Sequence, residues 1–319
     1  MHLLILSCGT RTLLTGYFMD RANGFDRVVT TDCSALAPAL YVSDACVIAP
    51  RMDDPSYPSF LLELCDREQI DVILPLHEDE LLFLAKNRAM FESRGITCVI
   101  SGEETVALCR DKAAFADAMR KEGIPVAETH TAKEVAEGTF SPSFPVYVKP
   151  RAGAGSEGNQ VVRTRALLDA LCEESPDLIL QPYLTGTEYG VHLYADLCDS
   201  HPAGAFVLQK IRMRAGETEK SVSVRRDDIR DLAFRVATSC PFRGPVDMDV
   251  METEEGLFLL EVNPRFGGAY PQAYVCGVNF PKMIAQNAGG VRLSEGFDEY
   301  PEGVTALRYA DICVRESLL

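Results

Sequence analysis

Two oxygen-bearing side chains, a cation and two glycines follow an apolar run within residues 259–268. In an extended strand, residues two apart point to the same side, so Glu261 and Asn263 project together, and Arg265 follows in the same row if the strand continues. We expect Pro264 to end the regular pairing there. Carboxylate and amide oxygens beside a guanidinium suit a hard cation that itself holds phosphate. An ordinary Glu261–Arg265 ion pair at a strand end is the alternative that this pattern alone leaves open.

A second pair of carboxylates precedes this segment. Residues 245–250 are expected to form a strand with Asp247 and Asp249 on one face, and the following segment is expected to return as its hairpin partner. The separation of Asp249 and Glu261 along the chain suits an antiparallel strand that comes back alongside the first. Asp249, Glu261 and Asn263 could then converge on Mg²⁺, which prefers such oxygens and keeps several waters for substrate phosphates.

Two lysines stand where phosphate could bind. Residues 144–150 are expected to form a strand ending near Lys149, and the glycine-rich stretch 151–159 can cradle phosphate with free backbone N–H groups. The chain then resumes as a strand, so this is not the strand–loop–helix of a P-loop, and a plain turn is the alternative. Lys112 lies near the start of an expected helix, where a cation opposes the helix dipole. A bound phosphate would remove that conflict, and a solvated lysine is the alternative.

A third group of cations lies on one expected strand, residues 206–214. Period-two spacing places Lys210, Arg212 and Arg214 on one face. Three like charges on one face repel each other unless anions or carboxylates meet them. The strand therefore faces an anion, or it is an exposed edge strand that charge protects from aggregation.

The N-terminal region alternates strands and helices, which favours a parallel sheet with right-handed crossovers. The turn at residues 7–12 lacks the Gly-x-Gly-x-x-Gly pattern, so we expect a Rossmann-like domain that binds no dinucleotide. His77, Glu78 and Asp79 follow a strand end and could face a second substrate, or could supply negative charge to the next helix. The strands are expected at 2–7, 27–31, 45–49, 71–74 and 97–100, and the helices at 9–23, 59–69 and 78–94.

The amino-acid composition excludes several classes of function. The 319-residue chain has a formal net charge of −16, which argues against general binding of nucleic acid or of an anionic membrane. No apolar stretch is long enough to cross a membrane. The eleven cysteines are scattered without metal-binding spacing. They are expected to be reduced core residues of a cytoplasmic protein, as in the apolar runs around Cys46, Cys98 and Cys198.

With these residues assembled, the sequence resembles the ATP-grasp superfamily over essentially the whole chain. It is most similar to the synthetase halves of the carbamoyl-phosphate synthase large subunit and to single-copy relatives. Residues 246–250 and 260–265 carry the resemblance best, with 144–158 next. It implies an α/β and α+β fold, in which a Rossmann-like pre-ATP-grasp domain precedes two lobes that grip ATP. The implied divisions are 1–105 for that domain, 106–184 for the small lobe with the glycine-rich loop, and 185–319 for the large lobe with the metal site.

The resemblance also implies roles for individual residues. One or two Mg²⁺ ions, or Mn²⁺, would be held by Asp249, Glu261 and Asn263. Arg265 would stabilise the transferred phosphate, and Lys210 or Arg212 would help to hold the reacting groups. Carbamoyl-phosphate synthases usually carry Gln at the position of Asp249. The residues implied to contact ATP are Lys112, Lys149, Gly153, Gly155, Ser156, Gly158, Gln181, Pro182, Tyr183, Leu184 and Glu188.

The implied activity is that of an ADP-forming ligase. It would join a carboxylate to an amine, or to a thiol, through an acyl phosphate, with an amino acid or another small carboxylate as substrate. One synthetase unit is present, so carbamoyl-phosphate synthesis by this chain alone is not expected. An ATP-binding subunit, a carbamoyl-phosphate-synthase-like enzyme and a kinase-like enzyme that use the same site are the alternatives. Dimers are common in the family, so a homodimer is one expected state.

Overall fold

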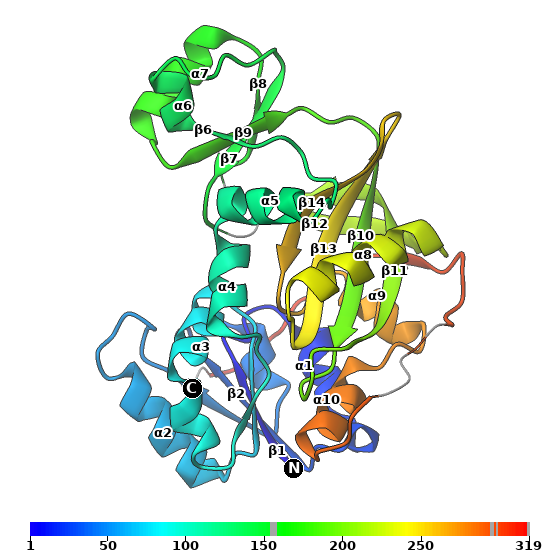
Figure 1. Ribbon diagram of the computed structural model, residues 1–319. Coiled ribbons are helices and arrows are strands. Elements are labelled where there is room, and N and C mark those ends of the chain that lie inside the picture. Colours follow the sequence, from blue (N-terminus) through cyan, green and yellow to red (C-terminus); the bar gives the residue numbers. More distant parts are fainter. Residues whose placement is uncertain (154–157, 294–296, 298, 318–319) are drawn as a thin grey trace.

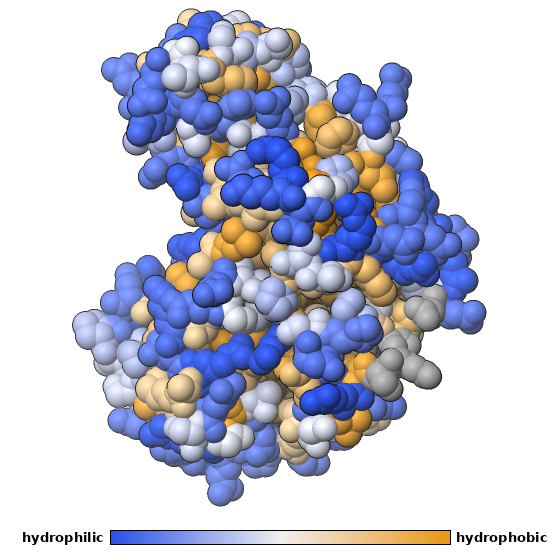
Figure 2. Space-filling view, in the orientation of Figure 1, coloured by the Kyte–Doolittle hydropathy of each residue, from blue (hydrophilic) through white to orange (hydrophobic). Residues whose placement is uncertain are grey.

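The computed structural model describes residues 1–153, 158–293, 297 and 299–317 (Figure 1). Within these residues, three β-sheets of five, six and four strands form the framework. Figure 1 shows the five-stranded sheet at the bottom, the six-stranded sheet at the centre right, and the four-stranded sheet in a lobe at the top. The space-filling view shows an indentation between that lobe and the lower part of the molecule (Figure 2).

The five-stranded sheet is parallel, in the order β3-β2-β1-β4-β5, which confirms the expected parallel sheet. Helix α1 is shorter than the helix expected over 9–23. Gly9 takes a left-handed conformation (φ 49°) before it, and Gly24 (φ 94°) caps a separate 3₁₀ turn after it. The elements are β1 (His2–Leu6), α1 (Thr12–Met19), η1 (Arg21–Asn23), β2 (Arg27–Asp32), η2 (Pro38–Tyr41), β3 (Ala45–Ile48), α2 (Tyr57–Glu68), β4 (Val72–Pro75), α3 (Glu78–Glu92) and β5 (Thr97–Cys98).

Two helices, α4 (Glu103–Arg110) and α5 (Lys112–Lys121), connect the lower domain to the upper lobe (Figure 1). The expected helix near whose start Lys112 lies is α5, and the chain breaks before it at Asp111 (φ −91°, ψ 92°). The Asp111 side chain accepts a hydrogen bond from the backbone of Ala114 and caps α5. The same carboxylate binds Arg151 through two hydrogen bonds of 2.8 and 2.6 Å.

The upper lobe is a small antiparallel sheet, in the order β6-β9-β7-β8, with two helices. Val148, Val162 and Leu168 are fully buried in its core. The glycine-rich stretch links β7 to β8, so the expected strand–loop–strand arrangement is present. The elements are β6 (His130–Thr131), α6 (Ala132–Ala136), β7 (Val146–Pro150), β8 (Gln160–Val162), α7 (Arg165–Glu174) and β9 (Leu178–Pro182).

The six-stranded sheet is antiparallel, in the order β14-β13-β10-β11-β12-β15. One face packs on α8, where Met248 and Val250 are fully buried. The other face carries the polar residues of the site described below. The elements are β10 (Thr187–Ala195), β11 (Pro202–Arg214), β12 (Glu217–Ser223), α8 (Asp227–Ser239), β13 (Gly244–Thr253), β14 (Gly256–Asn263), α9 (Tyr270–Val275), α10 (Phe280–Ala288) and β15 (Thr305–Leu307).

The five-stranded and six-stranded sheets share one apolar core, which contains side chains from β1, α1, β11, α9 and α10. The ring of Phe266 lies 6.0 Å from that of Phe18 and 4.7 Å from that of Tyr270. Phe280 stacks on Tyr270 at 4.8 Å, and all four rings are buried. Because Phe266 directly follows Arg265, this packing fixes the position of Arg265 relative to the N-terminal domain.

The expectation that Cys198 is a core residue is wrong. All eleven cysteines are free thiols; Cys98 is buried and Cys46 is partly buried, but Cys198 is exposed. Strand β10 ends at Ala195, and the Asp196 side chain accepts the Cys198 N–H at 2.6 Å in the turn that follows. Cys198 is therefore a turn residue and not a core residue. Among the described helices, none is long and apolar enough to cross a membrane.

The buried carboxyl group of Glu80 predicts a pH-dependent stability. Burial raises its pKa from 4.5 to about 7, and Tyr57 donates a hydrogen bond to it at 2.6 Å. The raised pKa means that the folded protein holds this proton more tightly than the unfolded chain. Stability is therefore present in full below pH 4.5 and is lost as the pH rises through 7, by about 3 kcal/mol for this group.

Glu80→Gln should remove this dependence. Urea unfolding at pH 5.5 and 8.5 should show wild type losing stability relative to Glu80→Gln at the higher pH. Glu92→Gln, a change at an exposed position at the end of the same helix, is the control and should follow wild type. An equal pH dependence in wild type and Glu80→Gln would show that Glu80 does not carry the effect.

Candidate functional site

The β13–β14 hairpin brings the predicted oxygen ligands together. Asp249 lies directly opposite Glu261, and Asp247 lies opposite Asn263, so the expected return of the second strand is confirmed. Directly opposite residues share a face of the sheet. The three predicted metal ligands therefore lie on one face, and β14 ends at Asn263, where Pro264 was expected to stop the pairing.

Lys210 is bound between two carboxylates of this face. Its Nζ donates to Asp249 at 2.6 Å and to Glu188 at 2.7 Å, and only 7% of its side chain is exposed. Strand β10 lies between Lys210 and Asp249, and it presents Gly190 there: a Cβ at this position would lie 3.5 Å from Lys210 Cε. That is an ordinary contact, and the same Cβ would lie closer, at 3.1 Å, to Leu208 Cδ1. Burial opposes the charge of Lys210, but Asp249 and Glu188 outweigh it and raise its pKa.

The carboxylates of this face are close enough to repel one another. Burial raises the pKa of Asp249, and the neighbouring Asp247 and Glu188 raise it further against the opposing effect of Lys210. His192 Nδ1 lies 3.2 Å from Asp247 Oδ1. A divalent cation would relieve this repulsion, so the residues present fit Mg²⁺.

The protein ligands alone do not form a closed metal cage. Within the described ranges, no group of three or more His, Cys, Asp or Glu is placed to hold a metal ion. Asp249 and Glu261 supply carboxylates, and the third predicted ligand, Asn263, is an amide. Its nitrogen, oriented by its neighbours, donates to Glu78 at 3.0 Å and to Glu261 at 3.3 Å. The set suits an ion that completes its shell with water and phosphate oxygens.

Arg265 pairs across the domain junction and not along its own strand. Its Nη2 donates to Glu78 at 3.1 Å, and its Nη1 lies 3.9 Å from Asp247. The alternative Glu261–Arg265 ion pair is absent from these contacts. Glu78 begins α3, so the loop predicted to face a cleft does place one carboxylate in the site. The neighbouring Asp79 binds Arg110 instead.

The predicted phosphate lysines approach the hairpin from two sides. Lys149 is 4% exposed, and its Nζ lies 3.5 Å from the carbonyl oxygen of Leu260. Burial lowers the pKa of Lys149, with the Glu261 charge opposing that effect. Lys112 Nζ donates to the carbonyl of Gly153 at 2.6 Å, at the start of the glycine-rich stretch. Gly153 (φ 128°) and Gly158 (φ 77°) adopt left-handed backbone conformations, and the predicted contacts Gly155 and Ser156 lie outside the described residues.

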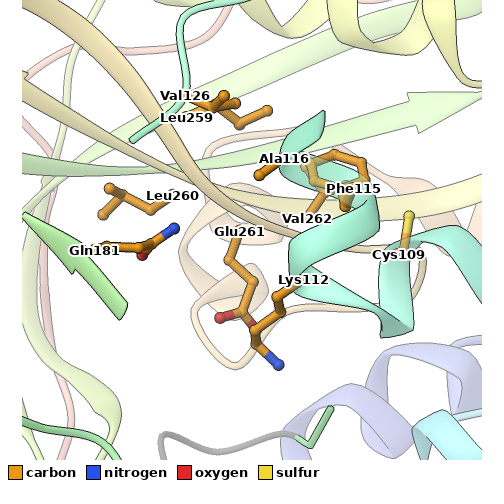
Figure 3. Close-up of a pocket in the computed structure, with 10 residues that line it drawn as sticks. All are labelled: Cys109, Lys112, Phe115, Ala116, Val126, Gln181, Leu259, Leu260, Glu261 and Val262. Atoms are coloured by element: carbon orange, nitrogen blue, oxygen red, sulfur yellow. The ribbon is translucent and has the colours of Figure 1, made fainter. Parts of the chain in front are cut away.

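A shallow pocket adjoins these groups (Figure 3). Two predicted nucleotide contacts, Gln181 and Lys112, line it together with the predicted metal ligand Glu261, and Figure 3 shows all three side chains around it. Gln181 is buried and donates to Thr129 at 2.9 Å. Its apolar wall suits a planar base and its charged mouth suits phosphate. The lining residues are Cys109, Lys112, Phe115, Ala116, Val126, Gln181, Leu259, Leu260, Glu261 and Val262.

Several predicted residues lie apart from that pocket. Pro182 and Tyr183 are exposed and Leu184 is partly buried at the end of β9, none of them lining the pocket. The Glu188 carboxylate lies on Lys210, as described above. The structure thus brings Gln181 to the pocket but leaves the rest of this segment beside it.

The three cations predicted on one face of β11 all meet carboxylates. Register shifts flank Arg212 in the pairing with β12, but the same register holds before and after them. Arg212 is 61% exposed and binds Glu219 at 2.8 Å, and Arg214 contacts the same carboxylate at 3.4 Å. Lys210 alone of the three is buried on the face with Asp249.

Sequence reasoning missed two features of the site. The pairing of His192 with Asp247 requires β10 to lie beside β13, and no local pattern predicts that neighbour. Gly267 was part of the starting segment but had no stated role. A Cβ there would lie 2.1 Å from Asp247 Oδ1, so only glycine fits against this carboxylate.

Known protein families and several known proteins are similar to this chain. Residues 109–269 match the model of the ATP-grasp domain, and residues 3–99 match that of the PylC-like, N-terminal domain. The 3-methyl-D-ornithine–L-lysine ligase of Methanosarcina acetivorans is 24% identical over 270 residues, which cover 82% of this chain and 65% of that protein. The carbamoyl phosphate synthase large chain of Deinococcus radiodurans is 24% identical over 294 residues, which cover 84% of this chain and 28% of that protein.

The chain thus spans 65% of the length of the first relative. Among solved structures, the biotin carboxylase domain of Hydrogenobacter thermophilus 2-oxoglutarate carboxylase, a dimer in complex with MgADP, ADP and bicarbonate, has a TM-score of 0.75 and 17% identity. The similarity covers 95% of this chain and 73% of that one, and at this identity it shows the fold. Because the ATP-grasp model matches half of the sequence, on the strands and loops that carry the site, the chain belongs to the ATP-grasp family.

Proposed function

We propose that the chain is an ATP- and Mg²⁺-dependent carboxylate–amine ligase that releases ADP and phosphate. The observation that carries this proposal is the joint placement of Asp249, Glu261 and Asn263 on one face of the β13–β14 hairpin. Arg265 follows at its end, and the buried Lys149 contacts its backbone. Oxygen ligands, a guanidinium and a lysine in this order suit the transfer of a phosphoryl group to a carboxylate.

The pocket beside Gln181 supports a place for ATP. The adenine base of ATP would lie against the apolar wall of the pocket and against β9. The Glu188 carboxylate would accept hydrogen bonds from the ribose hydroxyls. The phosphates would then extend toward Lys112, Lys149 and the glycine-rich stretch. The full proposed set is Lys112, Lys149, Gly153, Gly155, Ser156, Gly158, Gln181, Pro182, Tyr183, Leu184 and Glu188.

Asp249, Glu261 and Asn263 would hold one or two Mg²⁺ ions, and Mn²⁺ would accept the same oxygens. The ion would neutralise charge on the phosphates during transfer. The residues of the chain do the remaining work. Arg265 and Lys210 would hold the substrate carboxylate and the γ-phosphate in line, with the more exposed Arg212 as an outer cation.

The proposed reaction has two displacements. A carboxylate oxygen of the substrate attacks the γ-phosphorus, the bond to the β-phosphate oxygen breaks, and ADP leaves. The amine nitrogen of a second substrate then attacks the carbonyl carbon of the acyl phosphate, and phosphate leaves as the nitrogen loses a proton. Both steps need positioning and exclusion of water and do not need a nucleophilic side chain. The named activity of the Methanosarcina relative, a ligase of two amino acids, supports amino acids as substrates.

The proposed activity predicts ADP release from Mg-ATP that depends on an acid–amine pair. A panel of amino acids and small carboxylates, scored by coupled ADP detection and by product mass, should give one condensed product with an amide bond. A stable phosphorylated product would indicate a kinase. Tight ATP binding without turnover on any pair would indicate an ATP-binding subunit.

The metal assignment predicts a loss of that turnover in Glu261→Gln and in Asn263→Ala. Each change removes an oxygen ligand, so ADP release should fall by about 100-fold or more, as when an electrostatic stabiliser of a transition state is lost. The urea midpoint of each variant should stay close to that of wild type. Glu254→Gln, at an exposed position in the turn of the same hairpin, is the matched control and should keep full activity. Near-normal turnover in both ligand variants would defeat the assignment.

A further inference from the structure

Arg11 lies in the loop between β1 and α1, at the carboxyl edge of the parallel sheet. That edge is where open α/β sheets place their ligand-binding crevices. Its guanidinium makes no hydrogen bond or ion pair with any of the residues that the structure describes. The side chain is partly buried, so an unmatched charge there is not solvated as it would be on an open surface.

The carboxylates near Arg11 already have partners. Glu217 forms an ion pair with Arg308, and Asp247 is held by His192 and Arg265. The charges of both carboxylates, and those of Arg265 and Arg308, act on the Arg11 guanidinium. Burial, followed by the charge of Arg265, lowers the pKa of Arg11. An arginine keeps its charge under such a shift, so its donors face the site ionised and unpaired.

The backbone of Gly268 packs closely against this guanidinium. A Cβ at Gly268 would lie 3.2 Å from Arg11 Nη1 and 3.8 Å from Glu217 Oε1. Gly268 stands three residues after Arg265 in the segment that we place at the reaction centre. Arg11 Nη1 thus lies beside the segment that follows the proposed phosphate-transfer residue Arg265, and Arg11 does not line the pocket beside Gln181.

We propose that Arg11 binds a carboxylate of a substrate that the reaction does not consume. This inference rests on the proposed ligase function and names its substrate class: one of the two substrates is an amino acid or a dicarboxylate that keeps a free carboxylate in the product. A planar carboxylate matches the forked donors of a guanidinium and offers it two parallel hydrogen bonds. The N-terminal domain thereby supplies a specificity residue to a site that the large lobe otherwise builds.

The test compares each L- and D-amino acid with its α-carboxamide in Arg11→Gln and wild type. Arg11→Gln should raise KM for the carboxylate form by roughly 30-fold, the loss expected for a buried charged hydrogen-bond partner. It should change KM for the α-amide by less than about 3-fold, which is within the scatter of such comparisons. Arg11→Lys should recover part of the loss because it keeps the charge but not the fork. Arg51→Gln, at an exposed arginine of the same domain, is the control and should match wild type.

Two further comparisons show which of the two substrates carries the carboxylate that Arg11 binds. If it belongs to the amine substrate, the α-amide still condenses in wild type, with a higher KM. If it belongs to the acid substrate, the discrimination appears with aspartate or glutamate against their half-amides. Mg-ATP affinity, measured by calorimetry, should be unchanged in Arg11→Gln, because a large loss there would make Arg11 a phosphate ligand and overturn the inference.

A binding arm keeps this test independent of turnover. Calorimetry with the same amino acids in the presence of Mg-ADP should show binding that Arg11→Gln weakens. Such binding without ADP release in wild type would overturn the ligase function and leave the role of Arg11 standing. Equal losses for the acid and the amide, no loss for either, or no binding by any member of the panel would overturn the role of Arg11.

Discussion

Crowded carboxylates on one sheet face are the constraint on which the rest of the site depends. Glu188, Asp247, Asp249 and Glu261 all project from β10, β13 and β14 toward the same side. Two like charges about 4 Å apart repel by roughly 4 kcal/mol at the effective dielectric of a protein surface. The surrounding cations therefore have structural roles before any substrate binds. Lys210 joins two of these carboxylates, and Arg265 and His192 meet a third.

The shared apolar core stabilises those charge contacts. Phe266 anchors the segment after Arg265 between Phe18 of α1 and Tyr270 of α9. The Glu78–Arg265 pair then forms between elements that are already held together, so little side-chain or domain entropy remains to oppose it. Arg265 and Glu78 are 12% and 16% exposed, which limits screening by water and salt. The N-terminal domain is thus part of the site through packing as well as through charge.

Local patterns in the sequence predicted much of this arrangement. The parallel sheet and the β13–β14 pairing follow from the alternation of strands and helices, from period-two spacing and from short connections, and the structure confirms them. What local spacing could not predict is which distant elements become neighbours. Lys210 meets Asp249 only because β10 lies between β11 and β13, and Arg265 meets Glu78 across the domain junction. The cations of β11 show the same limit, since the carboxylates that meet them, Asp249 and Glu219, come from other strands.

The glycines near these charges show how the space of the site is specified. Gly190 packs against Leu208, Gly267 admits the carboxylate of Asp247, and Gly268 borders the guanidinium of Arg11. None of the three glycines has the left-handed backbone conformation that usually accounts for a glycine. These positions therefore require glycine because it has no side chain, and not because of a turn. At the first two positions a described side chain fills the space left free. At Gly268 the neighbouring guanidinium has no partner within the described chain, and its geometry and charge are those of a receptor for an anionic group. In the proposed ligase, the segment 259–268 would therefore provide metal ligands at one end and, through Gly268 and Arg11, a substrate contact at the other.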